Sequence, residues 1–133
     1  MKHILRVTLA VMVTAGLLMG PAAEAHVRKA PTSLSLKASK TKVHKGHKVT
    51  FTIHLKSAWS KCVQQQPIKW FKNGVYKKTV TTNNNGVVTL TKKMHHSGTF
   101  RAKYLGRRWG KHPHRHVCYA SQSKGVFIKV KGS

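Results

Sequence analysis

Apolar and polar residues alternate most regularly between residues 49 and 56. The apolar positions hold β-branched, aromatic or aliphatic side chains, which are Val49, Phe51, Ile53 and Leu55. Successive side chains of a strand point to opposite faces of a sheet, so this pattern predicts a strand with one buried face. The residue types favour the same structure, because β-branched and aromatic side chains fit a pleated, half-buried surface.

Five shorter stretches show the same alternation, namely residues 33–37, 68–72, 87–91, 100–105 and 126–130, and residues 75–82 are expected to form a returning strand after a turn. Turn residues separate them, and the clearest turn is Asn73-Gly74, a dipeptide typical of a two-residue hairpin. No helical period is found beyond the first 25 residues. About seven short strands at this spacing predict an all-β fold, either a sandwich or a small barrel.

Two segments resemble the immunoglobulin-like domains of exported bacterial proteins. Residues 68–74 (IKWFKNG) are similar to the strand that carries the core tryptophan, and residues 97–104 (SGTFRAKY) are similar to the start of the penultimate strand. The resemblance implies a single immunoglobulin-like β-sandwich of about seven antiparallel strands over residues 33–131. One departure concerns the cysteines that join the two sheets in antibody domains, since Ile53 and Ala102 occupy the comparable inward positions.

The first 25 residues have the pattern of a secretory signal peptide. A short basic segment precedes an apolar run too short to span a bilayer, and Ala23-Glu24-Ala25 fits a cleavage site. We expect cleavage after Ala25 and a secreted protein that its charge retains at the cell wall. A membrane anchor made of the same segment is the alternative. We expect no membrane span after cleavage, and we expect residues 26–32 to form a flexible basic arm.

The charge balance is extreme. The chain has 26 lysines and arginines, one acidic residue and a formal net charge of +25. The acidic residue is Glu24, so the mature chain would have no side-chain carboxylate. This excludes carboxylate acid–base pairs, a Ser-His-Asp triad and calcium sites built from carboxylates. We therefore expect neither an enzyme nor a cofactor. Cations that are not neutralised within the chain attract polyanions.

The chain has two cysteines, Cys62 and Cys118. In an exported chain of this size they predict one disulfide, with free thiols or a metal pair as the alternative. Closing a loop of about 57 residues would stabilise the fold by about 4 kcal/mol.

Two predicted loops, residues 57–66 and 106–116, would project from the same end of such a sandwich and be held by this disulfide. Aromatic rings stack on bases or sugars and cations hold phosphates, so this end is a candidate polyanion or glycan site. The alternative is that the two loop tryptophans, Trp59 and Trp109, cap the sandwich and cover the disulfide. The candidate site residues are Trp59, Lys61, Arg107, Arg108, Trp109, Lys111 and Arg115.

Three histidines alternate in the second predicted loop. If the segment is extended, His112, His114 and His116 share a face and would suit zinc or copper(II). The absence of a carboxylate to orient the rings, together with the positive surroundings, counts against a metal site.

The sequence thus predicts a secreted, monomeric, non-enzymatic module that binds anionic polymers or an anionic cell surface. The expected ligands are cell-wall phosphate polymers, acidic polysaccharide or nucleic acid. The alternatives are a protein-interaction or adhesion module, a cationic antimicrobial factor, and metal capture by the three histidines.

Overall fold

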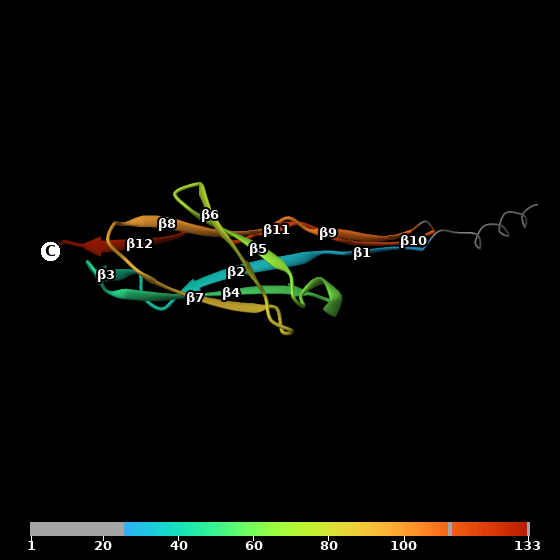
Figure 1. Ribbon diagram of the computed structural model, residues 1–133, viewed down its shortest axis with the longest axis horizontal. Helices are drawn as coiled ribbons and strands as arrows, with labels where there is room; N and C mark the ends of the chain where they lie inside the picture. Colours follow the sequence, from blue (N-terminus) through green and yellow to red (C-terminus); the bar gives the residue numbers. More distant parts are fainter. Residues whose placement is uncertain (1–25, 112, 133) are drawn as a thin grey trace, which may run out of the picture. The chain divides into compact units, whose positions relative to one another are not determined.

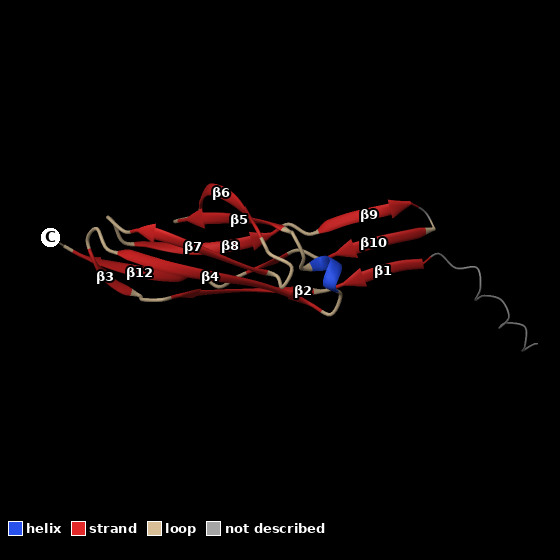
Figure 2. Cartoon of the chain, turned by 60° about the horizontal axis from the view of Figure 1, so that its bottom comes forward, coloured by secondary structure: helices blue, strands red, loops and turns tan. Residues whose placement is uncertain are grey.

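The computed structural model describes residues 26–111 and 113–132. The predicted signal peptide lies outside the described residues. Apart from the short 3₁₀ helix η2 (Ser60–Cys62), the regular secondary structure of the described residues is strand (Figures 1 and 2). The chain divides into two compact units. The larger unit contains the described parts of 29–108 and 117–133, and the smaller unit contains those of 1–28 and 109–116. No helix within 26–111 and 113–132 has the length and apolar character needed to cross a membrane.

One sheet of the larger unit has three antiparallel strands in the order β2-β4-β7. They are β2 (Thr32–Ala38), β4 (Lys48–Ser57) and β7 (Val87–Lys93). The central strand is the segment with the most regular alternation, and its apolar residues are buried as predicted. Together with Leu34 of β2, which pairs with Leu55, these side chains form the apolar face of this sheet.

The second sheet has the strand order β3-β12-β8-β5-β6. Its strands are β3 (Lys42–His44), β12 (Val126–Lys131), β8 (Gly98–Tyr104), β5 (Pro67–Lys72) and β6 (Val75–Thr81). A two-residue strand, β11 (Ser121–Gln122), pairs with β8. Strands β3 and β12 pair in parallel, which corrects the prediction of an antiparallel fold throughout. The alternation pattern missed β3 because three residues are too few to show a period.

The hairpin between β5 and β6 turns at the predicted dipeptide. Asn73 has φ 52° and Gly74 has φ 81°, so both central residues have the positive φ that a type I′ turn requires.

The core of the larger unit contains an aromatic cluster to which both sheets contribute. The Phe51 ring of β4 lies 5.0 Å from Trp70 of β5 and 4.7 Å from Phe100 of β8, measured between ring centroids. Trp70 and Phe100 stack at 5.3 Å. All three side chains are buried. Two sheets that share one apolar core confirm the predicted immunoglobulin-like β-sandwich.

Two segments differ from their predictions. Residues 26–32 were expected to form an arm and 106–116 a loop, but both contribute strands to a third sheet with the order β1-β10-β9. Its strands are β1 (His26–Ala30), β10 (His114–Cys118) and β9 (Arg107–Lys111). These segments lack a regular apolar alternation, which is why the sequence did not predict strands. They are strands because their backbones hydrogen-bond to one another, and composition does not reveal such pairing.

Candidate functional site

The predicted disulfide between Cys62 and Cys118 is present, with the two Cα atoms 5.6 Å apart. Cys62 ends the short 3₁₀ helix η2 (Ser60–Cys62), and Cys118 ends β10. Both cysteines are buried. The bridge therefore fixes a loop to a strand end, in contrast to the disulfide of antibody domains, which joins the two sheets through the core.

A buried polar network also fixes the segment that contains η2. The Gln66 side-chain amide donates a hydrogen bond to the Gln64 carbonyl (2.8 Å), and the Tyr104 hydroxyl donates one to Gln66 Oε1 (2.7 Å). Burial raises the pKa of Tyr104, and the nearby Arg107 charge partly opposes that rise. Residues 60–66 are thus tied to β8 by a hydrogen bond and to β10 by the disulfide.

The predicted aromatic and basic site is divided between the two units. Trp59 is half-buried and Lys61, Arg107 and Arg108 are exposed, all in the larger unit. The remaining predicted residues belong to the smaller unit and are Trp109, Lys111 and Arg115. The convergence of the two groups on one ligand stays a prediction.

Within the smaller unit, Trp109 packs against a histidine. Its ring centroid lies 5.4 Å from that of His116, and the two ring planes are tilted by 36° relative to each other. Trp109 is therefore partly engaged within its own hairpin.

The three-histidine metal hypothesis is not tested, because His112 lies outside the described residues. His114 and His116 alternate on β10. Among residues 26–111 and 113–132, no group of three His, Cys, Asp or Glu side chains is placed to hold a metal ion.

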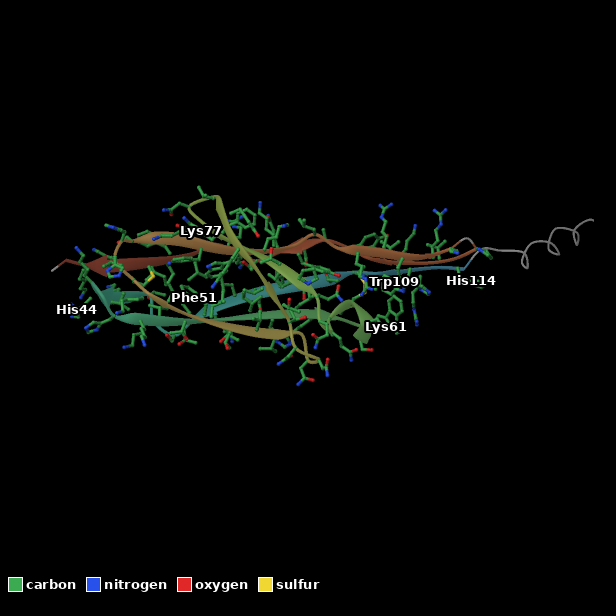
Figure 3. The ribbon with its side chains drawn as sticks, viewed as in Figure 1. His44, Phe51, Lys61, Lys77, Trp109 and His114 are labelled. Atoms are coloured by element: carbon green, nitrogen blue, oxygen red, sulfur yellow. A yellow bond between two sulfur atoms is a disulfide. The ribbon has the colours of Figure 1, made fainter. Side chains whose placement is uncertain are left out.

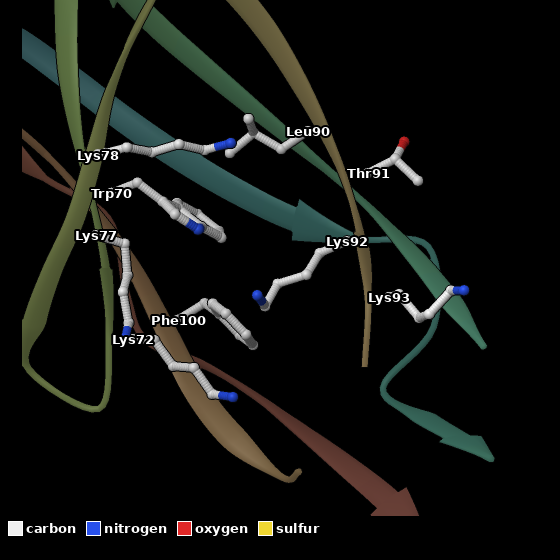
Figure 4. A pocket seen from close by; sticks show the side chains of 9 residues that line it. All are labelled: Trp70, Lys72, Lys77, Lys78, Leu90, Thr91, Lys92, Lys93 and Phe100. Atoms are coloured by element: carbon white, nitrogen blue, oxygen red, sulfur yellow. The ribbon is translucent and has the colours of Figure 1, made fainter. Parts of the chain in front are cut away.

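A group of lysines that the sequence analysis did not select lines a cleft between β6 and β7 (Figure 4). The cleft has a volume of about 530 Å³. Among the described strands, β6 pairs with β5 alone and β7 pairs with β4 alone, so each is the edge of its sheet. We call this site the lysine cleft, and its five lysines are Lys72, Lys77, Lys78, Lys92 and Lys93.

Lysines reach into the cleft from both sheets. In Figure 4, Lys78 of β6 extends toward Leu90 of β7, and Lys92 of β7 extends toward Phe100 of β8. Aromatic and aliphatic side chains contribute to the lining between them. The cleft thus combines an apolar lining with cations supplied from opposite sheets.

Lys72 is the most constrained of the five lysines. Its Nζ lies 5.6 Å from the centroid of the Phe100 ring, a cation–π contact. Its Cε runs so close to Gly98 that a Cβ at that glycine would lie 2.6 Å from it. Partial burial, together with the charges of Lys92 and Lys77, lowers the pKa of Lys72. The ammonium group is thus held among like charges.

The sequence does carry a signal for this site. Lys77-Lys78 and Lys92-Lys93 are adjacent basic pairs at strand positions. The sequence does not show that the two strands lie on the same side of the sandwich, and that placement turns two separate pairs into one cluster.

A second cationic surface lies on the sheet that contains β5 and β6. Lys69 Nζ lies 4.9 Å from the Tyr76 ring centroid, and Lys103 Nζ lies 4.7 Å from that of Phe71. The Phe71 and Tyr76 rings meet edge to face at 5.9 Å. Rings and cations are therefore adjacent on this surface.

Comparisons with known proteins give a distant likeness in fold. No family model matches the chain, and no curated protein matches its sequence. A crystal structure of the CARDB domain of a Pyrococcus furiosus protein, in complex with di-metal ions, is 14% identical with a TM-score of 0.45 and covers 74% of this chain and 91% of that chain.

A solution structure of the same Pyrococcus furiosus domain is 12% identical, with a TM-score of 0.49, and covers 77% of this chain and 96% of that chain. A superoxide reductase (neelaredoxin) from Ignicoccus hospitalis is 15% identical, with a TM-score of 0.44, and covers 82% of this chain and 83% of that chain. Likeness at this level carries no information about function.

Proposed function

We propose that this chain is an exported, non-enzymatic module that binds anionic polymers by electrostatic attraction. The observation that carries the proposal is the spread of unneutralised cations over both sheets. Residues 26–132 contain no aspartate or glutamate. Exposed lysines occur on strands of both sheets and include Lys37, Lys56, Lys77, Lys92 and Lys129. Lys77 of β6 is labelled among the side chains in Figure 3.

The mechanism follows from the charge of the ligand. A polymer of phosphates holds condensed counterions, and each lysine or arginine that neutralises a phosphate releases one of them into solution. The gain in counterion entropy drives binding without a defined polymer sequence. Rings beside cations, as at Phe71 and Tyr76, would add short-range contacts to bases or sugars.

Cell-wall phosphate polymers, acidic polysaccharide and nucleic acid share the required chemistry, which is a chain of closely spaced anionic groups. The signal-peptide pattern of residues 1–25 supports a location outside the cell, where such polymers are abundant. The positive charge would then hold the protein at an anionic cell surface.

The test is the salt dependence of binding to a fluorescently labelled single-stranded DNA, measured by anisotropy. If about 6–10 phosphates are neutralised, affinity should fall by about 10³–10⁵ between 50 and 200 mM salt. Labelled dextran of similar length is the uncharged control and should not bind. Binding that does not depend on salt, or equal binding to dextran, would contradict the proposal.

A further inference from the structure

We propose that the lysine cleft is a defined binding site for a compact chain of phosphate groups, with inorganic tripolyphosphate as its simplest form. The inference rests on the proposed function, because both require attraction for phosphate. It goes further by assigning one site, one ligand shape and named residues, whereas the proposed function needs only distributed charge.

The first argument is the lack of internal neutralisation. Five lysines line the cleft, and residues 26–132 contain no carboxylate that could pair with any of them. Like charges at short range repel more strongly where water is partly excluded. A bound anion would replace this repulsion with charge-assisted hydrogen bonds, which are among the stronger polar contacts in proteins.

The second argument is the shape of the site. A volume of about 530 Å³ lies within the range of about 300–1,000 Å³ typical of small-molecule pockets. The lysines come from β5 and β6 on one side and from β7 on the other. A ligand that contacts both sides must carry several negative charges within a short length, as a phosphate chain does.

The third argument is the placement of Lys72. The Phe100 ring and the close approach of Gly98 restrict where its ammonium group can lie. Less side-chain freedom is then lost when an anion binds, and such preorganisation favours affinity. Lys77, Lys78, Lys92 and Lys93 are exposed and would close on the ligand from the rim.

The alternative role for these lysines is protection of the open sheet edges. Charged side chains, lysine above all, prevent edge strands from pairing with another molecule. This role predicts that removing them causes self-association and does not predict a loss of phosphate binding. The two explanations therefore differ in a measurable way.

The experiment is isothermal titration of tripolyphosphate into the protein at about 150 mM salt, an ionic strength at which exposed charges are screened beyond about 8 Å. The site variant is Lys72→Gln/Lys92→Gln. The control, Lys37→Gln/Lys129→Gln, removes the same charge from exposed positions on β2 and β12, which are not part of the cleft. Thermal unfolding checks that both double variants remain folded.

The proposal predicts one ligand per protein, an affinity at least about 10-fold lower in the site variant, and a change of less than about 2-fold in the control. Equal losses in the two variants would mean that only net charge matters and would overturn the proposal. No loss in the site variant, or self-association as its sole consequence, would also overturn it.

Two further ligands define the required chemistry. Inorganic monophosphate should bind much more weakly than tripolyphosphate, and equal affinity would refute a site for a phosphate chain. ATP carries the same chain on a nucleoside, and binding comparable to tripolyphosphate would show that the chain is what the cleft recognises. Binding of ATP without binding of tripolyphosphate would refute that conclusion.

Failure of this inference can be distinguished from failure of the proposed function. If the cleft is not a site, the DNA assay should still show steep salt dependence, with the two double variants affected equally. If the proposed function is wrong, the wild-type protein should fail to bind DNA at 50 mM salt.

Discussion

Removal of one buried hydroxyl should destabilise the fold by a predictable amount. Tyr104 and Gln66 are each 1% exposed, and their hydrogen bond is 2.7 Å long. Tyr104→Phe deletes the donor and leaves Gln66 Oε1 without it in a buried position. Such a change costs about 1–3 kcal/mol. In a domain of about 100 residues, a loss of 2 kcal/mol lowers Tm by about 8–16 °C.

The matched control is Tyr76→Phe, which removes the same atom from a surface position. Tyr76 is 49% exposed, and its hydroxyl shares a 2.8 Å hydrogen bond with Thr79 Oγ1. Water can replace this bond, so the variant should stay within about 0.5 kcal/mol of the wild type. Urea unfolding followed by tryptophan fluorescence, together with thermal unfolding by circular dichroism, measures both variants.

A pH series adds a second check on the same group. Burial raises the pKa of Tyr104 above its ordinary value of 10.0, so the folded state favours the neutral phenol. Above about pH 10 the unfolded chain releases this proton more readily than the folded chain, and the stability that the residue contributes is lost. The wild-type advantage over Tyr104→Phe should therefore shrink in that range. Equal destabilisation by Tyr104→Phe and Tyr76→Phe, or no effect of either, would refute the reasoning.

Two other changes test the disulfide and the cleft. Cys62→Ala/Cys118→Ala removes the bridge between residues 56 positions apart and should lower the free energy of unfolding, measured in urea, by about 4 kcal/mol. A loss below about 1 kcal/mol would contradict the argument that the disulfide stabilises the fold by reducing the entropy of the unfolded chain. Lys72→Met should raise Tm at low ionic strength, because partial burial and the charges of Lys92 and Lys77 disfavour the charged form. The pKa of Lys72 is lower in the folded state, so the wild type gains stability as alkaline pH removes this proton. The difference in Tm between Lys72→Met and the wild type should therefore become smaller as pH rises. Added salt, which screens the repulsion, should also reduce it. A variant less stable than wild type at low salt would show that the contact of Lys72 with Phe100 outweighs the repulsion.

The fold could be predicted to the extent that it is encoded locally. Alternation over residues 49–56 identified β4, and Asn73-Gly74 identified the hairpin turn, because both signals lie within a few consecutive residues. Strands β9 and β10 were missed because their residues show no regular alternation, so their strand structure depends on pairing. The disulfide was predictable because the chain offers Cys62 one partner.

The candidate sites likewise combine features that the sequence determines with features that only the tertiary structure determines. The sequence alone determined the high positive charge and the absence of carboxylates after Glu24, and the resemblance of residues 68–74 predicted a core position for Trp70, which is buried. Tertiary structure decided that β6 and β7 form the two sides of one cleft, and that Gln66 meets Tyr104 across 38 residues. The physical reason is that side-chain periodicity is set by neighbours along the chain, whereas strand order is set by backbone pairing and core packing between distant segments. The basic pairs Lys77-Lys78 and Lys92-Lys93 are visible in the sequence, but only the packing of the two sheets brings them to one cleft.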